Sequence, residues 1–274
     1  MLRQELIENL KKLTQHEELE IVLRGNSAIT SALSILPKES TILIPAEGGW
    51  LHYKLGPKKL NLAVEEVRCE DARIDLKDLR YKLSTKPYAA FLYQNPGGYF
   101  AEQPTEEIYK LCHQHNCLVI LDVSGALGTE LCTGQFADIL IASFGEGKLV
   151  EAKVGGFVSA QDWKLWEQLR PHLEKLENKD DLQRIREKLR ELPTRIHYLE
   201  ELQMKVIHDL RAMRQDVVHP ADIGFVVVAK FQKPAEKEKI INYCQENKLE
   251  WTECPRYIRL NQPAISIEIK KLEQ

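Results

Sequence analysis

Continuous apolar runs, rather than alternating ones, dominate the first 160 residues of this 274-residue chain. Runs of this kind are typical of strands that are buried on both faces, as in parallel sheets. The predicted strands are 19–23, 41–45, 60–64, 89–93, 118–122, 139–143 and 156–160, and helical patterns at 2–13, 27–36, 76–83 and 105–115 lie among them. We therefore expect an α/β fold, in which helices cover both faces of a mostly parallel sheet in three layers.

The pattern changes after residue 160. Two long, charged helical stretches follow at 161–178 and 180–213, and we expect Pro171 and Pro193 to interrupt them. Beyond them, strands at 225–231, 249–252, 257–260 and 264–267 and a helix at 234–247 outline a small α+β domain. The predicted organisation is a large domain at 1–160, connecting helices at 161–221 and a small C-terminal domain at 222–274.

Composition narrows the possible partners. Hydrophobic residues make up 43% of the chain, charged residues 29%, and the net charge is -3 with both signs interspersed. This distribution of charge contains no basic cluster that would bind nucleic acid or an anionic membrane. We see no secretory signal and no apolar run near the roughly 20 residues that span a bilayer, so we expect a cytoplasmic protein without a membrane partner.

Cysteine and histidine suggest no metal site. The six cysteines are scattered without a paired pattern, as is usual for reduced thiols in the cytosol. The one ligand-like cluster, at residues 112–117, straddles a predicted helix end and a strand start, so its side chains should diverge. Such residues are also common in cores and at helix ends, and we expect no bound metal.

Candidate chemistry lies at the strand ends, where ligands of parallel sheets bind. Asn95 begins an Asn-Pro turn, Asp122 ends a strand, and Lys148 stands between glycine-rich segments. A Lys amine can form a Schiff base with the aldehyde of pyridoxal 5'-phosphate. A carboxylate beside the ring nitrogen keeps that nitrogen protonated, so the ring can accept a carbanion's electrons.

Several blocks resemble known enzymes. The stretches 95–98, 106–108, 111–116 and 119–122 are similar to the corresponding run of fold-type I pyridoxal-phosphate-dependent aminotransferases (the aspartate aminotransferase-like superfamily). The segments 122–128 and 143–148, followed by the paired glycines 155–156, look like the lysine motif of the DegT/DnrJ/EryC1 branch. This resemblance implies the type I fold, the cofactor, and an amino-acid or keto-acid substrate.

The resemblance also implies a role for each matching residue. Lys148 would form the Schiff base, and Asp122 would face the pyridine nitrogen. The other implied contacts are Asn95 to the phenolic oxygen, Gly25, Asn26, Ser27 and Ser143 to the phosphate, Trp50 to the ring face, and Arg259 to the substrate α-carboxylate. A planar guanidinium suits that last, bidentate contact.

Simpler interpretations of these residues stay open. Lys153 competes for the Schiff-base role, and residues 25–27, taken alone, are more typical of a plain capped helix start than of a phosphate site. Asp122 and Asn95 are common turn residues, and an Arg at position 259 is often structural. The sequence Gly145-Glu-Gly-Lys148 does not continue as a nucleotide-binding loop, because Leu149 replaces the Ser or Thr.

We therefore predict a pyridoxal-phosphate-dependent aminotransferase that acts on an amino acid. The alternatives are a lyase, decarboxylase or desulfurase, for which Cys254 is the candidate thiol, a sugar aminotransferase, and a non-catalytic binding protein. Gly156 occupies the position at which many amino-acid aminotransferases carry a phosphate-binding Arg. Lys153 or a partner subunit would have to compensate, and we expect a homodimer.

Overall fold

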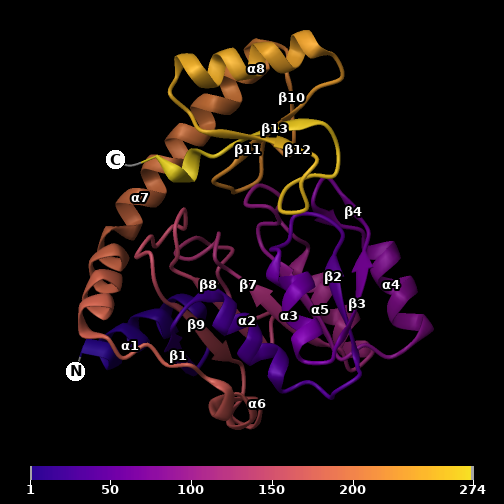
Figure 1. Cartoon of the computed structure of the whole chain (residues 1–274), viewed down its shortest axis with the longest axis vertical. Helices are drawn as coiled ribbons and strands as arrows, with labels where there is room; N and C mark the ends of the chain where they lie inside the picture. The colour runs from indigo at the N-terminus through magenta and orange to yellow at the C-terminus, as the bar shows by residue number, and fades with distance from the viewer. Residues whose placement is uncertain (1, 273–274) are drawn as a thin grey trace.

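A computed structural model describes residues 2–272, and a seven-stranded sheet forms its larger part (Figure 1). The strand order is β1-β9-β8-β7-β6-β2-β3. The strands are β1 (Glu18–Val22), β2 (Thr41–Pro45), β3 (Ala63–Val67), β6 (Ala90–Gln94), β7 (Leu118–Asp122), β8 (Ile139–Ser143) and β9 (Gly156–Ala160). Strands β3, β2, β6, β7 and β8 pair in parallel, whereas β9 is antiparallel to both β8 and β1.

Helices cover both faces of this sheet. Helices α2 (Gly25–Ser34), α3 (His52–Lys59) and α6 (Trp163–Leu169) pack on one face. The other face carries α1 (Leu2–Thr14), α4 (Leu76–Thr85), α5 (Thr105–Gln114) and the first half of α7 (Lys179–Ala212). Every residue of β6 and β9 is buried, which explains their continuous apolar sequences. The predicted three-layer α/β fold is confirmed.

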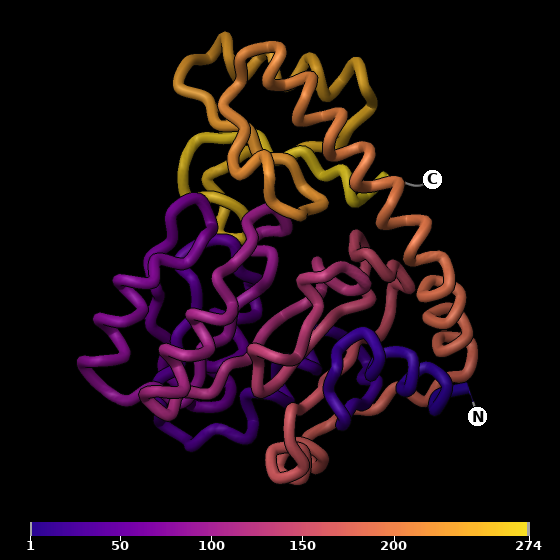
Figure 2. Tube along the Cα trace, turned by 180° about the vertical axis from the view of Figure 1, so that it is seen from behind, coloured from indigo at the N-terminus to yellow at the C-terminus, as the bar shows by residue number. Residues whose placement is uncertain are grey.

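A second, four-stranded antiparallel sheet lies beyond the carboxyl edge of the first. Its order is β10-β11-β13-β12, with β10 (Asp216–Val217), β11 (Val227–Lys230), β12 (Trp251–Cys254) and β13 (Ala264–Ile267). Helix α8 (Pro234–Glu246) and the second half of α7 pack against it. Seen from behind, α7 runs from the level of the large sheet to this small domain (Figure 2). The remaining elements are the hairpin β4 (Cys69–Glu70) and β5 (Arg73–Ile74) and the 3-10 turns η1 (Arg170–His172) and η2 (Ile269–Lys271).

Most predicted elements occupy the expected residues. Strands 41–45, 118–122, 139–143, 156–160 and 264–267 match the structure at both ends. The edge strand β3 begins three residues later than predicted, because the apolar residues at 60 and 62 pack near α3 while the half-exposed strand itself is polar. The sequence analysis missed α3, which carries Pro57 in its last turn.

Three predictions were wrong. The stretch 161–178 is interrupted near Pro171 as expected, but residues 173–178 beyond it are not helical. Pro193 does not interrupt its helix: α7 is continuous over 34 residues, and buried apolar residues on both sides of the proline hold it against the core. Residues 257–260 form a turn rather than a strand, closed by a hydrogen bond from the Arg256 amide to the Leu260 carbonyl at 2.7 Å. The division of the chain at residues 160 and 221 stays a prediction.

Over residues 2–272, every helix is too short or too polar to cross a membrane.

Candidate active site

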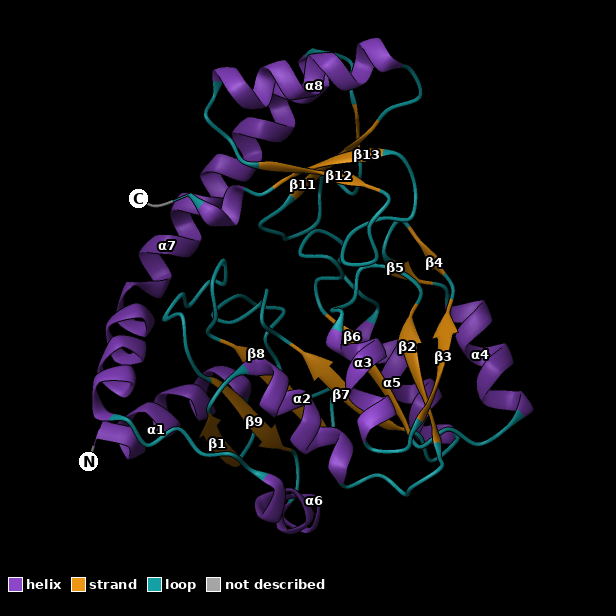
Figure 3. Cartoon of the chain, viewed as in Figure 1, coloured by secondary structure: helices purple, strands orange, loops and turns teal. Residues whose placement is uncertain are grey.

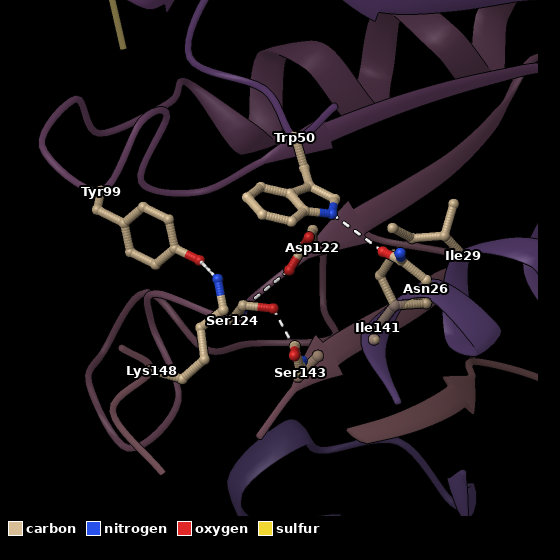
Figure 4. A pocket seen from close by; sticks show the side chains of 11 residues that line it. Asn26, Ile29, Trp50, Tyr99, Asp122, Ser124, Ile141, Ser143 and Lys148 are labelled. Carbon is tan, nitrogen blue, oxygen red and sulfur yellow. Dashed lines mark hydrogen bonds between the residues drawn. The ribbon is translucent and has the colours of Figure 1, made fainter. Parts of the chain in front are cut away.

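A pocket opens at the carboxyl ends of β7 and β8, next to the start of α2. Loops fill the region between it and the small sheet (Figure 3). Figure 4 shows Asn26, Trp50, Tyr99, Asp122 and Lys148 around this pocket. Its lining comprises Gly25, Asn26, Ile29, Trp50, Tyr99, Asp122, Ser124, Ile141, Ala142, Ser143 and Lys148. The pocket therefore contains most of the site residues that the sequence predicts.

The N-terminus of α2 forms one wall of the pocket. Its N-cap residue, Arg24, makes no side-chain capping bond, and the first turn has no acidic residue. Gly25 lies so close to β8 that a Cβ atom there would come within 2.5 Å of the Ser143 Cβ. Backbone N–H groups at a helix start attract anions, and here a serine hydroxyl stands beside them. This wall fits a phosphate better than a capped helix start would.

Ser27 points elsewhere. Its hydroxyl donates a 2.6 Å hydrogen bond to the Glu174 carboxylate, and it is not among the lining residues. The Ser143 hydroxyl accepts a bond from the Gly145 amide at 3.1 Å, which leaves its proton available to a ligand. Of the two serines that the sequence predicts at the phosphate, only Ser143 faces the pocket.

Asp122 lies in the pocket with its carboxylate fixed by two donors. The Tyr53 hydroxyl donates to Oδ2 at 2.7 Å, and the Ser124 amide donates to Oδ1 at 2.9 Å. The bond from the Ser124 amide stabilises the turn after β7, so Asp122 also has the role of a turn residue that the sequence left open. The carboxylate is 6% exposed and oriented, however, so it is also suited to hold a proton on a ligand nitrogen.

Lys148 reaches into the pocket from the loop after β8. Its Nζ hydrogen-bonds to the Tyr99 hydroxyl and lies 5.1 Å from the centroid of the Trp50 ring. Burial lowers the pKa of Lys148 to about 8, although the Asp122 carboxylate opposes this shift. Lys153, the competing residue, is exposed and does not line the pocket. The geometry therefore favours Lys148 as the nucleophilic amine.

Trp50 and Asn95 occupy different positions relative to the pocket. The Trp50 indole donates to the Asn26 side chain at 3.0 Å, which holds its ring over the opening near Lys148. Asn95 is buried beside the pocket without lining it, and its side-chain oxygen accepts the Gln103 amide at 3.0 Å. Its backbone amide donates to the Asp122 carbonyl at 3.1 Å. The contact of Asn95 with a phenolic oxygen stays a prediction.

Arg259 is buried in an ion pair. Both Nε and Nη2 donate to the Glu268 carboxylate, with a shortest distance of 2.7 Å, and Nη1 donates to the Ile258 carbonyl. Burial opposes ionisation of Glu268, but the neighbouring Arg259 and Lys270 hold its pKa at about 2. A bidentate contact with a substrate would require Glu268 to release the guanidinium.

The sequence analysis missed three groups that act on the site. Tyr53 fixes Asp122, Tyr99 contacts Lys148, and Ser124 accepts the Ser143 amide at 2.9 Å. Only Ser124 had a local signal, since it follows Asp122 in the same motif. No cluster of three metal-binding side chains occurs within residues 2–272.

Comparison with known proteins identifies the fold. Residues 66–185 match the DegT/DnrJ/EryC1/StrS aminotransferase family, and residues 195–274 match the MJ1341 family C-terminal domain. No curated protein matches the chain in sequence. Similar solved structures include the Helicobacter pylori aminotransferase PseC, involved in pseudoaminic acid biosynthesis, with a TM-score of 0.80 at 14% identity. This alignment covers 98% of the present chain and 85% of PseC.

Two further structures show the same architecture. An alanine–glyoxylate aminotransferase from Nostoc sp. superimposes with a TM-score of 0.74 at 14% identity, over 97% of this chain and 80% of the other. Serine palmitoyltransferase from S. paucimobilis, bound to a PLP–myriocin aldimine, gives 0.72 at 14% identity, over 97% and 71%. The predicted resemblance is confirmed in the fold and in the sequence pattern of residues 66–185. The chain has the fold of type I pyridoxal-phosphate-dependent enzymes, and its residues 66–185 carry the sequence pattern of the DegT/DnrJ/EryC1/StrS aminotransferases.

Proposed function

We propose that this protein is a pyridoxal-phosphate-dependent aminotransferase that holds its cofactor through Lys148 and acts on an amino acid. The observation that carries the proposal is the convergence of a half-buried lysine, an oriented carboxylate and an uncapped helix start on one pocket. When bound, pyridoxal phosphate supplies an electron sink for the bond that breaks at the substrate carbon.

The protein's own groups divide the work of binding. The amides at the start of α2 and the Ser143 hydroxyl would hold the phosphate, and Asp122 would keep the ring nitrogen protonated. Trp50 would cover one face of the ring, and Asn95 would approach the phenolic oxygen from beside Asp122. Tyr53 contributes by fixing the orientation of that carboxylate.

Lys148 would also carry the proton that moves during the reaction. A free amine with a pKa near 8 accepts and releases a proton at neutral pH far more easily than an ordinary lysine. The Tyr99 hydroxyl is hydrogen-bonded to Nζ and would orient it. The neutral amine is the form that bonds to the cofactor aldehyde, so this bond should form more slowly as the pH drops below about 8.

The candidate functions differ in the substrate that they require. Arg259 supports an amino acid or keto acid as substrate, because its guanidinium lies 5.5 Å from the centroid of the Tyr99 ring, which lines the pocket. Its pairing with Glu268 favours the second candidate, a sugar aminotransferase, which would need no α-carboxylate contact. Cys254 gives little support to a desulfurase, since it is buried and burial raises the pKa of its thiol.

A homodimer is part of the proposal. Trp50, Leu51 and Leu55 form an exposed apolar patch at and beside the mouth of the pocket, and Leu51 and Leu55 are 51% and 56% exposed. Burying such a patch against a second copy would be favourable and would close the pocket on its open side. We also propose a cytoplasmic location, which the six free cysteines support.

Lys148 should be the residue that bonds to the cofactor. After incubation with pyridoxal phosphate and reduction with borohydride, peptide mass mapping should find the adduct on Lys148. Lys148→Ala should abolish the labelling and Lys153→Ala should not. A label that persists at another lysine in the Lys148→Ala protein would reject the assignment.

Ser143→Ala should weaken cofactor binding, because it removes a hydroxyl that faces the anion. Losing one hydrogen bond to a charged group should cost about 1.5–3 kcal/mol, or roughly 10- to 150-fold in Kd. Ser27→Ala is the matched control, since its hydroxyl binds Glu174, and should leave Kd unchanged. Titration of the cofactor absorbance gives both values, and equal losses in the two variants would contradict the geometry.

Substitutions of Arg259 and Glu268 should have different effects if the substrate carries an α-carboxylate. Arg259→Ala should weaken amino-acid binding by about 2–4 kcal/mol, or roughly 30- to 1000-fold in kcat/KM, with cofactor affinity unchanged. Glu268→Gln frees the guanidinium and should not weaken it. Spectral titration with a panel of amino acids is the measurement. Unchanged amino-acid affinity in a folded Arg259→Ala protein would shift the proposal towards sugar substrates.

The apolar patch should mediate dimer formation. Sedimentation should find a dimer for the wild type, and Leu55→Glu should weaken it by placing a charge in the interface. Met204→Glu is the control, because Met204 is similarly exposed but lies on α7. A monomeric wild type with full activity would rule out this part of the proposal.

A further inference from the structure

A second buried lysine lies beside the loop that carries Lys148. Lys270, in the turn η2 near the end of the chain, is only 7% exposed. Its Nζ donates a 2.9 Å hydrogen bond to the carbonyl of Gly147, the residue before Lys148. Its nearest carboxylate oxygen, on Glu268, is 3.5 Å away. A lysine is rarely buried to this extent unless its charge has a functional role or a close ion-pair partner.

The two lysines share an aromatic neighbour. The Nζ atoms of Lys148 and Lys270 lie 4.7 Å and 5.0 Å from the centroid of the Tyr99 ring, and the Arg259 guanidinium lies at 5.5 Å. The Glu268 carboxylate accepts most of its hydrogen bonds from Arg259, so it compensates the charge of Lys270 only in part. Three basic side chains thus surround one ring, and Lys148 is the one that opens onto the pocket.

The backbone around Lys270 is held in place from two sides. The Arg195 guanidinium on α7 donates to the carbonyls of Lys270 and Leu272, at 2.6 Å and 3.1 Å. The Lys270 amide donates to the Phe225 carbonyl at 3.0 Å. The small domain and α7 therefore hold the backbone of Lys270, from which its side chain extends to the Gly147 carbonyl.

We propose that Lys270 is a positioning residue for Lys148. Lys270 fastens the loop at Gly147 and places a second positive charge beside the reactive amine. The proposal rests on the proposed function only in taking Lys148 as the nucleophile. Fastening the loop fixes the position of the amine, and the added charge favours its neutral form alongside the effect of burial.

The electrostatics follow from the neighbours. A like charge disfavours protonation of an amine, and the neutral form is the nucleophile. Burial lowers the pKa of Lys270 to about 8; Glu268 opposes this, while Arg259 and Lys148 add to it. The charged groups that face Lys148 are Asp122 and Glu268, which raise its pKa, Arg259, which lowers it, and Lys270, whose positive charge and that of Lys148 repel each other. The Tyr99 hydroxyl and the Trp50 ring also lie next to the Lys148 amine, and the Glu151 carboxylate accepts the Gly147 amide at 3.0 Å in the same loop.

The test measures the reactivity of Lys148 in the protein without cofactor. Trace labelling with acetic anhydride from pH 6 to 11, followed by peptide mass spectrometry, gives the pKa of individual lysines. In the wild type, Lys148 should titrate near 8. In Lys270→Met the pKa should rise by about one unit or more, which lowers labelling at pH 7.5 by about tenfold.

Three further variants make the result specific. Lys270→Arg keeps the charge and should keep the low pKa, whereas Lys270→Gln keeps a donor for Gly147 without the charge and should raise it. Lys271→Met is the matched control, because Lys271 is partly exposed and paired with Glu250, and it should leave Lys148 unchanged. Circular dichroism checks folding, and if Lys270→Met does not fold, the comparison of Arg with Gln decides.

The same pH profile for Lys148 in the wild type and in the uncharged variants would overturn the proposal. A profile that also shifts in Lys271→Met would overturn it too, because the effect would then be unspecific. Labelling needs no cofactor, so failure of pyridoxal phosphate to bind would reject the proposed function and leave this test intact.

Discussion

Parallel pairing of β6, β7 and β8 is the constraint on which the site depends. It places three strand ends at one edge of the sheet, so that the segments beginning at Asn95, Asp122 and Ser143 leave the core side by side. The adjoining start of α2 adds backbone donors to that edge because Gly25 permits close approach to β8. Polar groups can gather at this edge because the strands behind it are held together by a buried and mostly apolar core.

The central parts of this arrangement could be predicted from the sequence. Buried parallel strands are recognisable in the sequence as apolar runs. Polar residues at the ends of these runs, such as Asp122 and Ser143, are therefore easy to identify. The partners of these groups could not be predicted in the same way. Tyr53 lies 69 residues from Asp122, and Tyr99 lies 49 residues from Lys148, so only the tertiary fold brings them together. The turn at 257–260 resembles a strand in composition, but its hydrogen bonds close locally.

The buried pair of Arg259 and Glu268 shows why a residue type alone does not define a role. A guanidinium this deeply buried requires a carboxylate, since removing one partner of a buried pair commonly costs about 3–5 kcal/mol. Glu268 lies nine residues further along the chain and supplies that compensation across the small sheet. The pair supports the fold of the small domain and at the same time contributes to the field at Tyr99 and Lys148.

Helix α7 belongs to two cores at once. Leu182 and Ile185 near its start are packed with the large sheet, and Val206 and Leu210 near its end are packed with the small one. Since 34 residues of helix rise about 50 Å, a single element reaches both. If either core unfolded, the half of α7 that packs against it would lose its apolar contacts. A highly charged helical segment without such contacts is only marginally stable in water. Thermal unfolding of the two sheets is thereby coupled through a shared helix, although their strands form no common ladder.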